Sequence, residues 1–169
     1  MLNEIEKPET NYKGYIVGAV IGMLLLGALI YIASRRPSME DQAAAILEGS
    51  LRKGDPEFEA LSRDIIISTS DKTVESPNAF GSISMFIGGK IRNKGDKIIN
   101  GLEIHVSVVD SFQQILKEKR LLVVPTKQPR LGPGETIDVH LEIGGFDPKD
   151  DRADIRWKVT AIRLCTADC

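Results

Sequence analysis

The 169-residue chain has few of the side chains on which most enzymes and metal proteins depend. It contains two cysteines, two histidines and one tryptophan, and aromatic residues make up only 5% of it. Two cysteines exclude a disulfide-dense mini-domain, and two histidines leave few ligands for a zinc site. Neither sign of charge dominates, because 22 lysines and arginines stand against 24 aspartates and glutamates. The resulting net charge of −2 argues against a dedicated nucleic-acid-binding protein.

The chain does have one long apolar run near its N-terminus. Residues 15–33 contain no charged side chain. As a helix they would be about 28 Å long, close to the ~30 Å hydrocarbon core of a bilayer. We predict an N-terminal tail (1–14) and a transmembrane helix (15–34). The residues expected at the two membrane interfaces are aromatic or basic: Tyr12, Tyr15, Tyr31, Arg35 and Arg36.

Two other kinds of segment share this composition. A buried helix of a soluble core is disfavoured because no other segment could enclose it. A cleaved signal peptide is disfavoured because Glu4, Glu6 and Glu9 precede the run, where such peptides are basic, and no small-x-small cleavage site follows. A single-pass anchor is therefore expected. Basic residues flank its two ends almost equally, so they do not fix the orientation. Because Arg35 and Arg36 directly follow the helix, they slightly favour a cytoplasmic C-terminal part.

Three glycines recur at a spacing of four in and just before the apolar run. Gly14, Gly18 and Gly22 would lie along one face of a helix and leave a shallow groove that a second helix can approach. Glycine is also common in membrane helices without any packing role, so both explanations stay open. If the groove packs, its partner is a second copy of the chain or a larger membrane protein.

Residues 35–62 form the predicted juxtamembrane helical linker. Ser38 resembles a helix start and Gly49 a helix end, and Asp55-Pro56 resembles a second start. The linker could be an amphipathic strip on the membrane or on a partner. Because the strip is short and mostly acidic, we favour a plain linker that covers one end of the following domain.

From residue 63 to residue 165 the apolar pattern changes to a period of two. Strands are predicted over residues 65–67, 82–92, 102–108, 115–124, 137–143 and 155–164. Turn-forming residues separate them. Six or seven strands, each with one apolar and one solvent-exposed face, predict a mainly β, antiparallel two-sheet sandwich. Trp157 is expected to be its largest core side chain, and residues 166–169 form a C-terminal tail.

Two turn sequences in this part are similar to those of a known domain type. The run GGKIRNKG over residues 88–95 and the run LGPGET over residues 131–136 occur in the order found in FxLYD-type immunoglobulin-like domains of membrane-anchored bacterial proteins. The resemblance covers about residues 63–165. In these motifs Gly95 suits a positive φ, Pro133-Gly134 a tight turn, and Asn93 a bond to nearby backbone.

The resemblance implies an immunoglobulin-like sandwich in the bacterial cytoplasmic membrane. It further implies that the domain lies on the periplasmic side, whereas Arg35 and Arg36 slightly favour the cytoplasmic side. It also implies that the domain works by contact, without catalytic residues or cofactors. We expect a non-enzymatic accessory or structural subunit that docks onto a larger membrane complex, respiratory and photosynthetic assemblies being candidates. The alternative is a membrane-anchored ligand-binding or sensing module.

Few residues could carry chemistry. His105 and His140 are predicted on the solvent-exposed faces of separate strands. A metal site would require these strands to be neighbours and a third ligand to lie close by. Surface histidines are the simpler expectation. Cys165 and Cys169 could close a small disulfide loop in an oxidising compartment or stay free.

Two charged segments have an ordinary explanation beside a functional one. Acidic side chains over residues 147–154 could hold a weak calcium ion, but their spacing does not match an EF-hand loop, so a solvated loop is expected. The basic run over residues 117–120 is expected to keep an edge strand from pairing with another chain. No metal, cofactor or catalytic site is predicted.

Overall fold

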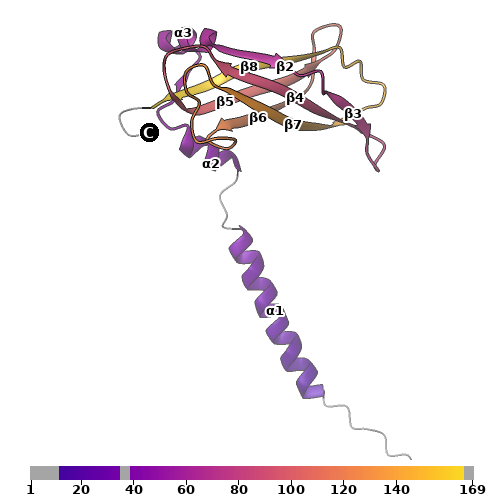
Figure 1. Ribbon diagram of the computed structural model, residues 1–169. Helices are drawn as coiled ribbons and strands as arrows, with labels where there is room; N and C mark the ends of the chain where they lie inside the picture. Colours follow the sequence, from indigo (N-terminus) through magenta and orange to yellow (C-terminus); the bar gives the residue numbers. More distant parts are fainter. Residues whose placement is uncertain (1–11, 35–38, 166–169) are drawn as a thin grey trace, which may run out of the picture. The chain divides into compact units, whose positions relative to one another are not determined.

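The computed structural model describes residues 12–34 and 39–165, and the chain divides into two compact units between residues 42 and 43. The first unit carries α1 (Tyr12–Ser34), an unbroken helix of 23 residues. The span Gly14–Ser34 has a mean hydropathy of 2.6 and is not buried within the protein. By length and composition α1 can therefore cross a membrane, as predicted (Figure 1).

The second unit is mainly β-structure. Its N-terminal part contains α2 (Met39–Ile46), which begins just before the unit boundary, then β1 (Leu51–Arg52) and α3 (Pro56–Asp64). Seven further strands follow: β2 (Ile65–Thr69), β3 (Val74–Pro77), β4 (Ile83–Asn93), β5 (Ile99–Val109), β6 (Ile115–Val124), β7 (Thr136–Phe146) and β8 (Asp154–Leu164).

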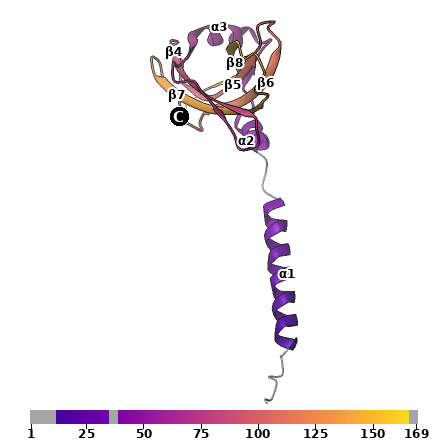
Figure 2. The same cartoon turned by 90° about the vertical axis from the view of Figure 1, so that its right-hand side faces the viewer.

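The strands form two antiparallel sheets. Sheet A has the order β1-β8-β5-β6, and in sheet B β4 lies between β7 on one side and β2 and β3 on the other. β2 pairs with the C-terminal half of β4 and β3 with the N-terminal half, so these two short strands follow each other along one edge. Viewed end-on, the sheets face each other with α3 across the top (Figure 2). The predicted mainly β sandwich is therefore confirmed.

The core lies between the sheets and consists of alternate residues from the long strands. Ile87 and Ile91 of β4 and Ile104 and Val106 of β5 are at most 1% exposed. Burying each such side chain contributes about 1.5–3 kcal/mol. Trp157 packs against this core but is only partly buried. The prediction that it is the largest core side chain is therefore wrong.

The structure differs from the sequence-based expectation mainly at the N-terminal border of the domain. The compact unit begins at residue 43, and both Leu47 and Phe58 are only 3% exposed. The segment expected to link helix and domain thus supplies side chains to the domain itself. β1 and β3 were not expected, because two residues show no period and the VESP sequence of β3 shows no apolar alternation.

The predicted role of Asn93 is confirmed. Its side-chain amide donates to the carbonyl oxygens of Lys97 at 2.8 Å and Leu131 at 3.3 Å, and its Oδ1 accepts from the Gly95 N–H at 2.9 Å. One buried side chain therefore joins the β4–β5 turn to the segment before β7.

The two turn glycines behave differently. Gly134 has φ +76°, which confirms the tight turn predicted at Pro133-Gly134. Gly95 is not among the residues with positive φ, so that prediction is wrong. Its small size matters instead, because a Cβ atom there would lie 3.1 Å from Oδ2 of Asp64.

Candidate functional site

The membrane helix presents the predicted glycines on one face. Gly14, Gly18 and Gly22 are four residues apart, and a Cβ atom added at any of them would meet nothing within 4 Å. The groove is thus open along α1. No partner chain is present to test a packing role, which stays a prediction.

The predicted interface residues lie near both ends of α1. Tyr12 and Tyr15 lie in its first turns and Tyr31 in its last turns, and all three side chains are exposed. This placement suits rings at two membrane interfaces. Arg35 and Arg36 lie outside the described residues, so their role stays a prediction.

The segment after α2 is fixed to the end of the sandwich. The Arg163 guanidinium of β8 donates to the Ile46 carbonyl oxygen at the end of α2, and its Nε donates to Oδ1 of Asn100 at 2.9 Å. Leu47 is buried beside β5, and Gly101 leaves room for Arg163: a Cβ on Gly101 would lie 2.9 Å from Cβ of Arg163 and in ordinary contact with Leu47. The helix that follows the anchor segment therefore ends in a firm attachment to sheet A.

Helix α3 connects the two sheets. It follows β1 of sheet A and leads directly into β2 of sheet B. Asp55 precedes it as expected for an N-cap, but its carboxylate accepts from the Arg52 N–H at 2.9 Å and makes no cap bond. Phe58 anchors α3 in the core.

A cleft of about 690 Å³ opens between α3, β2 and β8. Its apolar lining comes from one aromatic residue on α3 and from alternate residues on the two strands: Phe58, Ile65, Ile67, Ile155, Trp157 and Val159. Polar and charged groups also line it: Lys53, Glu59, Ser62, Thr69 and Lys158. A volume of this size is within the range of ligand-binding clefts.

Trp157 spans this cleft from β8 towards sheet B. Its Nε1–H donates to Oγ1 of Thr69 at 2.9 Å. Its ring lies over Gly89 of β4, where a Cβ atom would come within 2.7 Å of Cη2. The sequence pattern placed Trp157 on the inner face correctly, but it gave no sign of the hydrogen bond that holds the ring at the cleft.

The other end of the sandwich carries a second organised group of residues. Arg152, before β8, forms a two-pronged ion pair with Glu75 of β3 at 2.9 and 3.0 Å, and it also donates to the carbonyl oxygens of Asp147 and Asp150. Its guanidinium lies 5.9 Å from the centre of the Phe146 ring. The hydrogen bond from Arg152 lowers the pKa of the Glu75 carboxyl, against a smaller opposing effect of burial.

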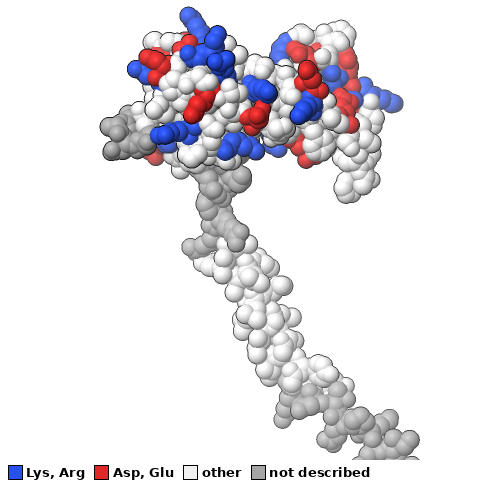
Figure 3. All heavy atoms as spheres, in the orientation of Figure 1, with Lys and Arg blue, Asp and Glu red and all other residues white. Residues whose placement is uncertain are grey.

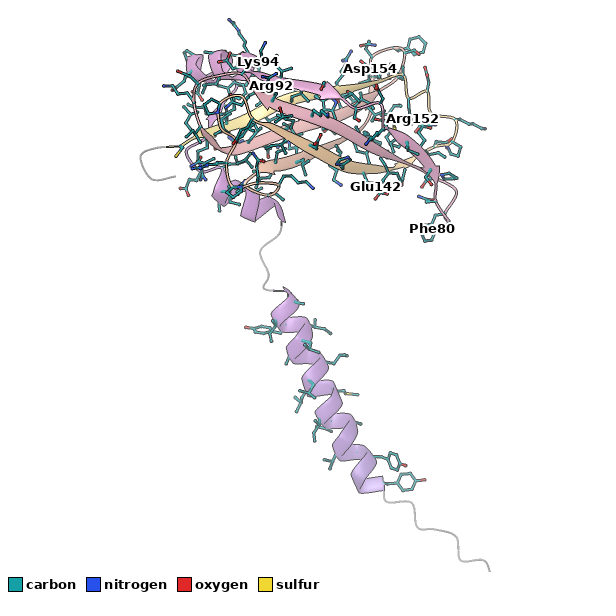
Figure 4. All side chains as sticks on the ribbon, viewed as in Figure 1. Phe80, Arg92, Lys94, Glu142, Arg152 and Asp154 are labelled. Atoms are coloured by element: carbon teal, nitrogen blue, oxygen red, sulfur yellow. The ribbon has the colours of Figure 1, made fainter. Side chains whose placement is uncertain are left out.

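Two phenylalanines are exposed at loop tips of that same end. Phe80 in the β3–β4 turn is 95% exposed, and Phe112 in the β5–β6 turn is 82% exposed. Figure 4 shows Phe80 pointing away from the body of the domain. Charges of both signs are dispersed over the visible face of the sandwich (Figure 3).

The two histidines lie in different sheets. His105 of β5 contacts Glu118 of β6 at 3.1 Å, and His140 is exposed on β7. Within residues 12–34 and 39–165, no three histidine, cysteine or acidic side chains are grouped so that they could hold a metal ion.

The carboxylates of the acidic loop over residues 147–154 form hydrogen bonds. Asp147 accepts from the Lys149 N–H at 2.9 Å, Asp150 accepts from the Asp147 N–H at 2.8 Å, and Asp151 accepts from the Ser111 hydroxyl. Asp147 and Asp150 therefore order the loop, and Asp151 joins it to the β5–β6 turn. The expectation of a solvated loop stays a prediction.

The predicted disulfide is only half within the described residues. The backbone N–H of Cys165 donates to the Ile98 carbonyl oxygen at 2.9 Å, which holds the residue beside the start of β5. Cys169 lies outside the described residues, so the pairing stays a prediction.

No protein-family model and no curated protein matches the chain, so membership of the FxLYD-type family stays an expectation. Several solved structures are similar to it at low identity. The ApaA protein of Bordetella pertussis is 20% identical over 60% of this chain and 91% of its own, with a TM-score of 0.38. A DUF1425 family member from Shewanella is 15% identical over 56% of this chain and 75% of its own, with a TM-score of 0.32.

The trimeric lipoprotein SadB of Salmonella enterica is similar over a longer part of the chain. It is 14% identical over 94% of this chain and 95% of its own, with a TM-score of 0.34. At these scores the likenesses carry no argument about what this chain binds or how it assembles.

Proposed function

We propose that this chain is a single-pass membrane protein of bacteria that works by contact, as a non-enzymatic accessory subunit of a larger membrane complex. The observation that carries the proposal is the combination of an exposed apolar helix with a folded domain. Only residues 35–38 separate α1 from α2, and the segment after α2 is attached to the sandwich through Leu47 and Arg163.

The ion pair between Glu75 and Arg152 has a structural role. Arg152 also donates to the carbonyl oxygens of Asp147 and Asp150, so the pair joins β3 to the loop before β8.

The open glycine face of α1 is the proposed contact within the membrane. To test it, the full chain is tagged and purified in mild detergent, and stoichiometric partners are identified. Replacing Gly18 and Gly22 by Leu fills the groove and should remove the partner. The matched control is Val20→Leu, on the opposite face of α1, which should retain it. Retention of the partner by the Gly18→Leu, Gly22→Leu variant would exclude this groove as the contact.

We further propose that the domain lies on the periplasmic side. Protease added to sealed spheroplasts should then degrade the sandwich and leave α1 protected. Digestion only after the membrane is opened would place the domain in the cytoplasm.

A second candidate function is a membrane-anchored ligand-binding module. The cleft beside Trp157 favours it, since its lining combines apolar side chains with polar groups that could orient a bound molecule. The two functions differ in a simple observation. An accessory subunit purifies with a stoichiometric partner, whereas a ligand-binding module purifies alone and responds to a small molecule.

A further inference from the structure

The cleft is bordered by two strand edges without a strand partner. β2 pairs with β4 on one side, and no other described strand pairs with it. β8 pairs with β5 along its whole length, but β1 covers its other edge only at Ala161 and Ile162. Within the described part of the chain, the first two thirds of that edge of β8 and the outer edge of β2 therefore both border the cleft.

On the opposite side of the sandwich the edge strands β6 and β7 do not pair as strands, but a side chain bridges them. There β6 and β7 lie beside each other, and Nζ of Lys119 in β6 donates to the Glu142 carbonyl oxygen of β7 at 2.9 Å. Lysines and arginines on β6 also discourage pairing with another chain. The outer edge of β3 carries Glu75, whose side chain is held by Arg152. The cleft differs from these places because two unpaired strand edges there flank one concave surface.

The side chains at these edges suit an incoming strand. Every second residue of β2 and β8 faces the cleft: Ile65, Ile67 and Thr69 on β2, and Ile155, Trp157 and Val159 on β8. A strand that adds to a sheet edge pairs through its backbone and inserts alternate side chains into such a surface. The five residues of β2 provide an edge of roughly 17 Å, enough for a segment of about five residues.

The rim charges indicate the composition of the segment. Lys53 and Lys158 flank the cleft and Glu59 is the acidic side chain there. Neither lysine forms an ion pair among the described residues. A segment with acidic residues beside its apolar ones would supply both lysines with partners.

We propose that this cleft accepts an extended segment of a partner protein, with alternating apolar side chains and flanking acidic residues, as an added β-strand. The inference rests on the proposed accessory function and specifies how the partner docks. β1 already occupies the far end of the same edge of β8, so the added strand would continue the line that β1 begins.

The fluorescence of Trp157 can monitor whether a peptide occupies the cleft. Trp157 is the single tryptophan and lines the cleft. A random seven-residue peptide library displayed on phage is selected against the full chain in nanodiscs, after removal of phage that bind empty nanodiscs. Enriched peptides are synthesised and titrated while Trp157 emission is recorded. We expect peptides with alternating apolar residues and net negative charge, each giving a saturable blue shift.

Variants on one strand locate the binding. Ile67→Glu places a charge in the cleft and should weaken peptide binding about tenfold or more, as loss of an interface anchor does. Ile66→Glu changes the neighbouring residue, which is 43% exposed on the other face of β2, and should leave the affinity nearly unchanged. If Ile67→Glu does not fold, Lys158→Glu tests the rim charge, with Lys90→Glu on the outer face of β4 as its control.

Three results would overturn the inference. One is the absence of enriched peptides. Another is peptide binding that does not change Trp157 emission, or that is as tight in the Ile67→Glu variant as in the wild-type chain. The third is a response to a fatty acid such as dodecanoate without a response to peptides, which would indicate an apolar-ligand site. If a co-purifying partner is lost with Gly18→Leu, Gly22→Leu but kept with Ile67→Glu, docking at the cleft fails and the accessory role stands. If the wild-type chain has no partner, the accessory role itself fails.

Discussion

The indole N–H of Trp157 and the hydroxyl of Thr69 form a hydrogen bond of 2.9 Å between residues 88 positions apart in the chain. Trp157 belongs to β8 of sheet A and Thr69 to the last position of β2 in sheet B. This bond joins the sheets on the side where they are otherwise open. It holds the aromatic ring at the cleft, where we propose that the partner binds.

Breaking this bond should weaken the domain measurably. A double-mutant cycle with Trp157→Phe and Thr69→Val should give a coupling free energy of about 0.5–1.5 kcal/mol, as for an ordinary intramolecular hydrogen bond. The measurement is urea unfolding of the full chain in detergent, followed by far-ultraviolet circular dichroism. A coupling energy near zero would mean that water replaces the bond without loss.

Substitution of Gly89 should displace the tryptophan ring. In Gly89→Ala the new Cβ would lie within 2.7 Å of Cη2, so the ring or β4 must shift. We expect a destabilisation of roughly 1–3 kcal/mol and a red shift of Trp157 emission. Lys90→Ala, an exposed site on the same strand, should change neither quantity. Unchanged emission in Gly89→Ala would contradict the packing described.

Changing Asn93 should loosen the two turns that it joins. Asn93→Ala removes its bonds to the Lys97 and Leu131 carbonyl oxygens and to the Gly95 N–H, which together should cost about 1–3 kcal/mol. Asn93→Asp should cost more at pH 7, because a carboxylate would face the carbonyl oxygens of Lys97 and Leu131. Urea unfolding at pH 7 and pH 4 should show that only Asn93→Asp partly recovers on acidification. Equal behaviour of both variants would disprove the assigned donor geometry.

The ion pair between Glu75 and Arg152 should make stability depend on pH. Because Arg152 lowers the pKa of folded Glu75, the folded state binds fewer protons at this site than the unfolded state. Its stabilisation is therefore present above the unfolded pKa, near 4.5, and is lost as the pH falls through the folded pKa. Since Glu75 is partly exposed to solvent, we expect only about 0.2–1 kcal/mol.

The measurement compares Glu75→Gln with wild type in urea at pH 7 and pH 3. The deficit of the variant should shrink as the pH falls, because wild-type Glu75 then takes up a proton and loses its ion pair. The control is Ser76→Ala on the same strand, which changes no ionisable group. A deficit that is the same at both pH values would argue that the pair contributes through packing alone.

Truncating Leu47 should destabilise the sandwich, although it lies in the segment that the sequence suggested was a linker. Leu47→Ala removes a side chain that is 3% exposed and should cost about 2 kcal/mol or more. Glu48→Ala, at the exposed neighbouring site, should be nearly neutral. Thermal unfolding of the full chain distinguishes them. Equal melting temperatures would mean that the segment only lies against the domain without supporting it.

Much of the fold follows from local pattern. The apolar run predicted α1, and the alternation of residues such as Ile137, Val139 and Leu141 predicted β7 and its inward face. Residue 115 to residue 124 was predicted as a strand with the bounds that β6 has. These features depend on neighbours in sequence, because a strand's side chains alternate between faces whatever the strand pairs with.

The apolar pattern did not predict the short strands β1 and β3. β1 has two residues and β3 has four, and neither is long enough to show a period. Leu47 lies in the turn after α2 and Phe58 in the short helix α3, where a single apolar residue does not reveal whether it faces a core. Their burial is known only once β5, β8 and α3 are in place.

By itself the sequence determined that the chain has one helix able to span a membrane, followed by strands with one apolar face each. Only the tertiary structure decided which edges pair and which stay open, and hence where the cleft lies. The physical reason is that these contacts join residues far apart along the chain. Glu75 and Arg152 are 77 positions apart, and nothing in either one's local sequence indicates the other.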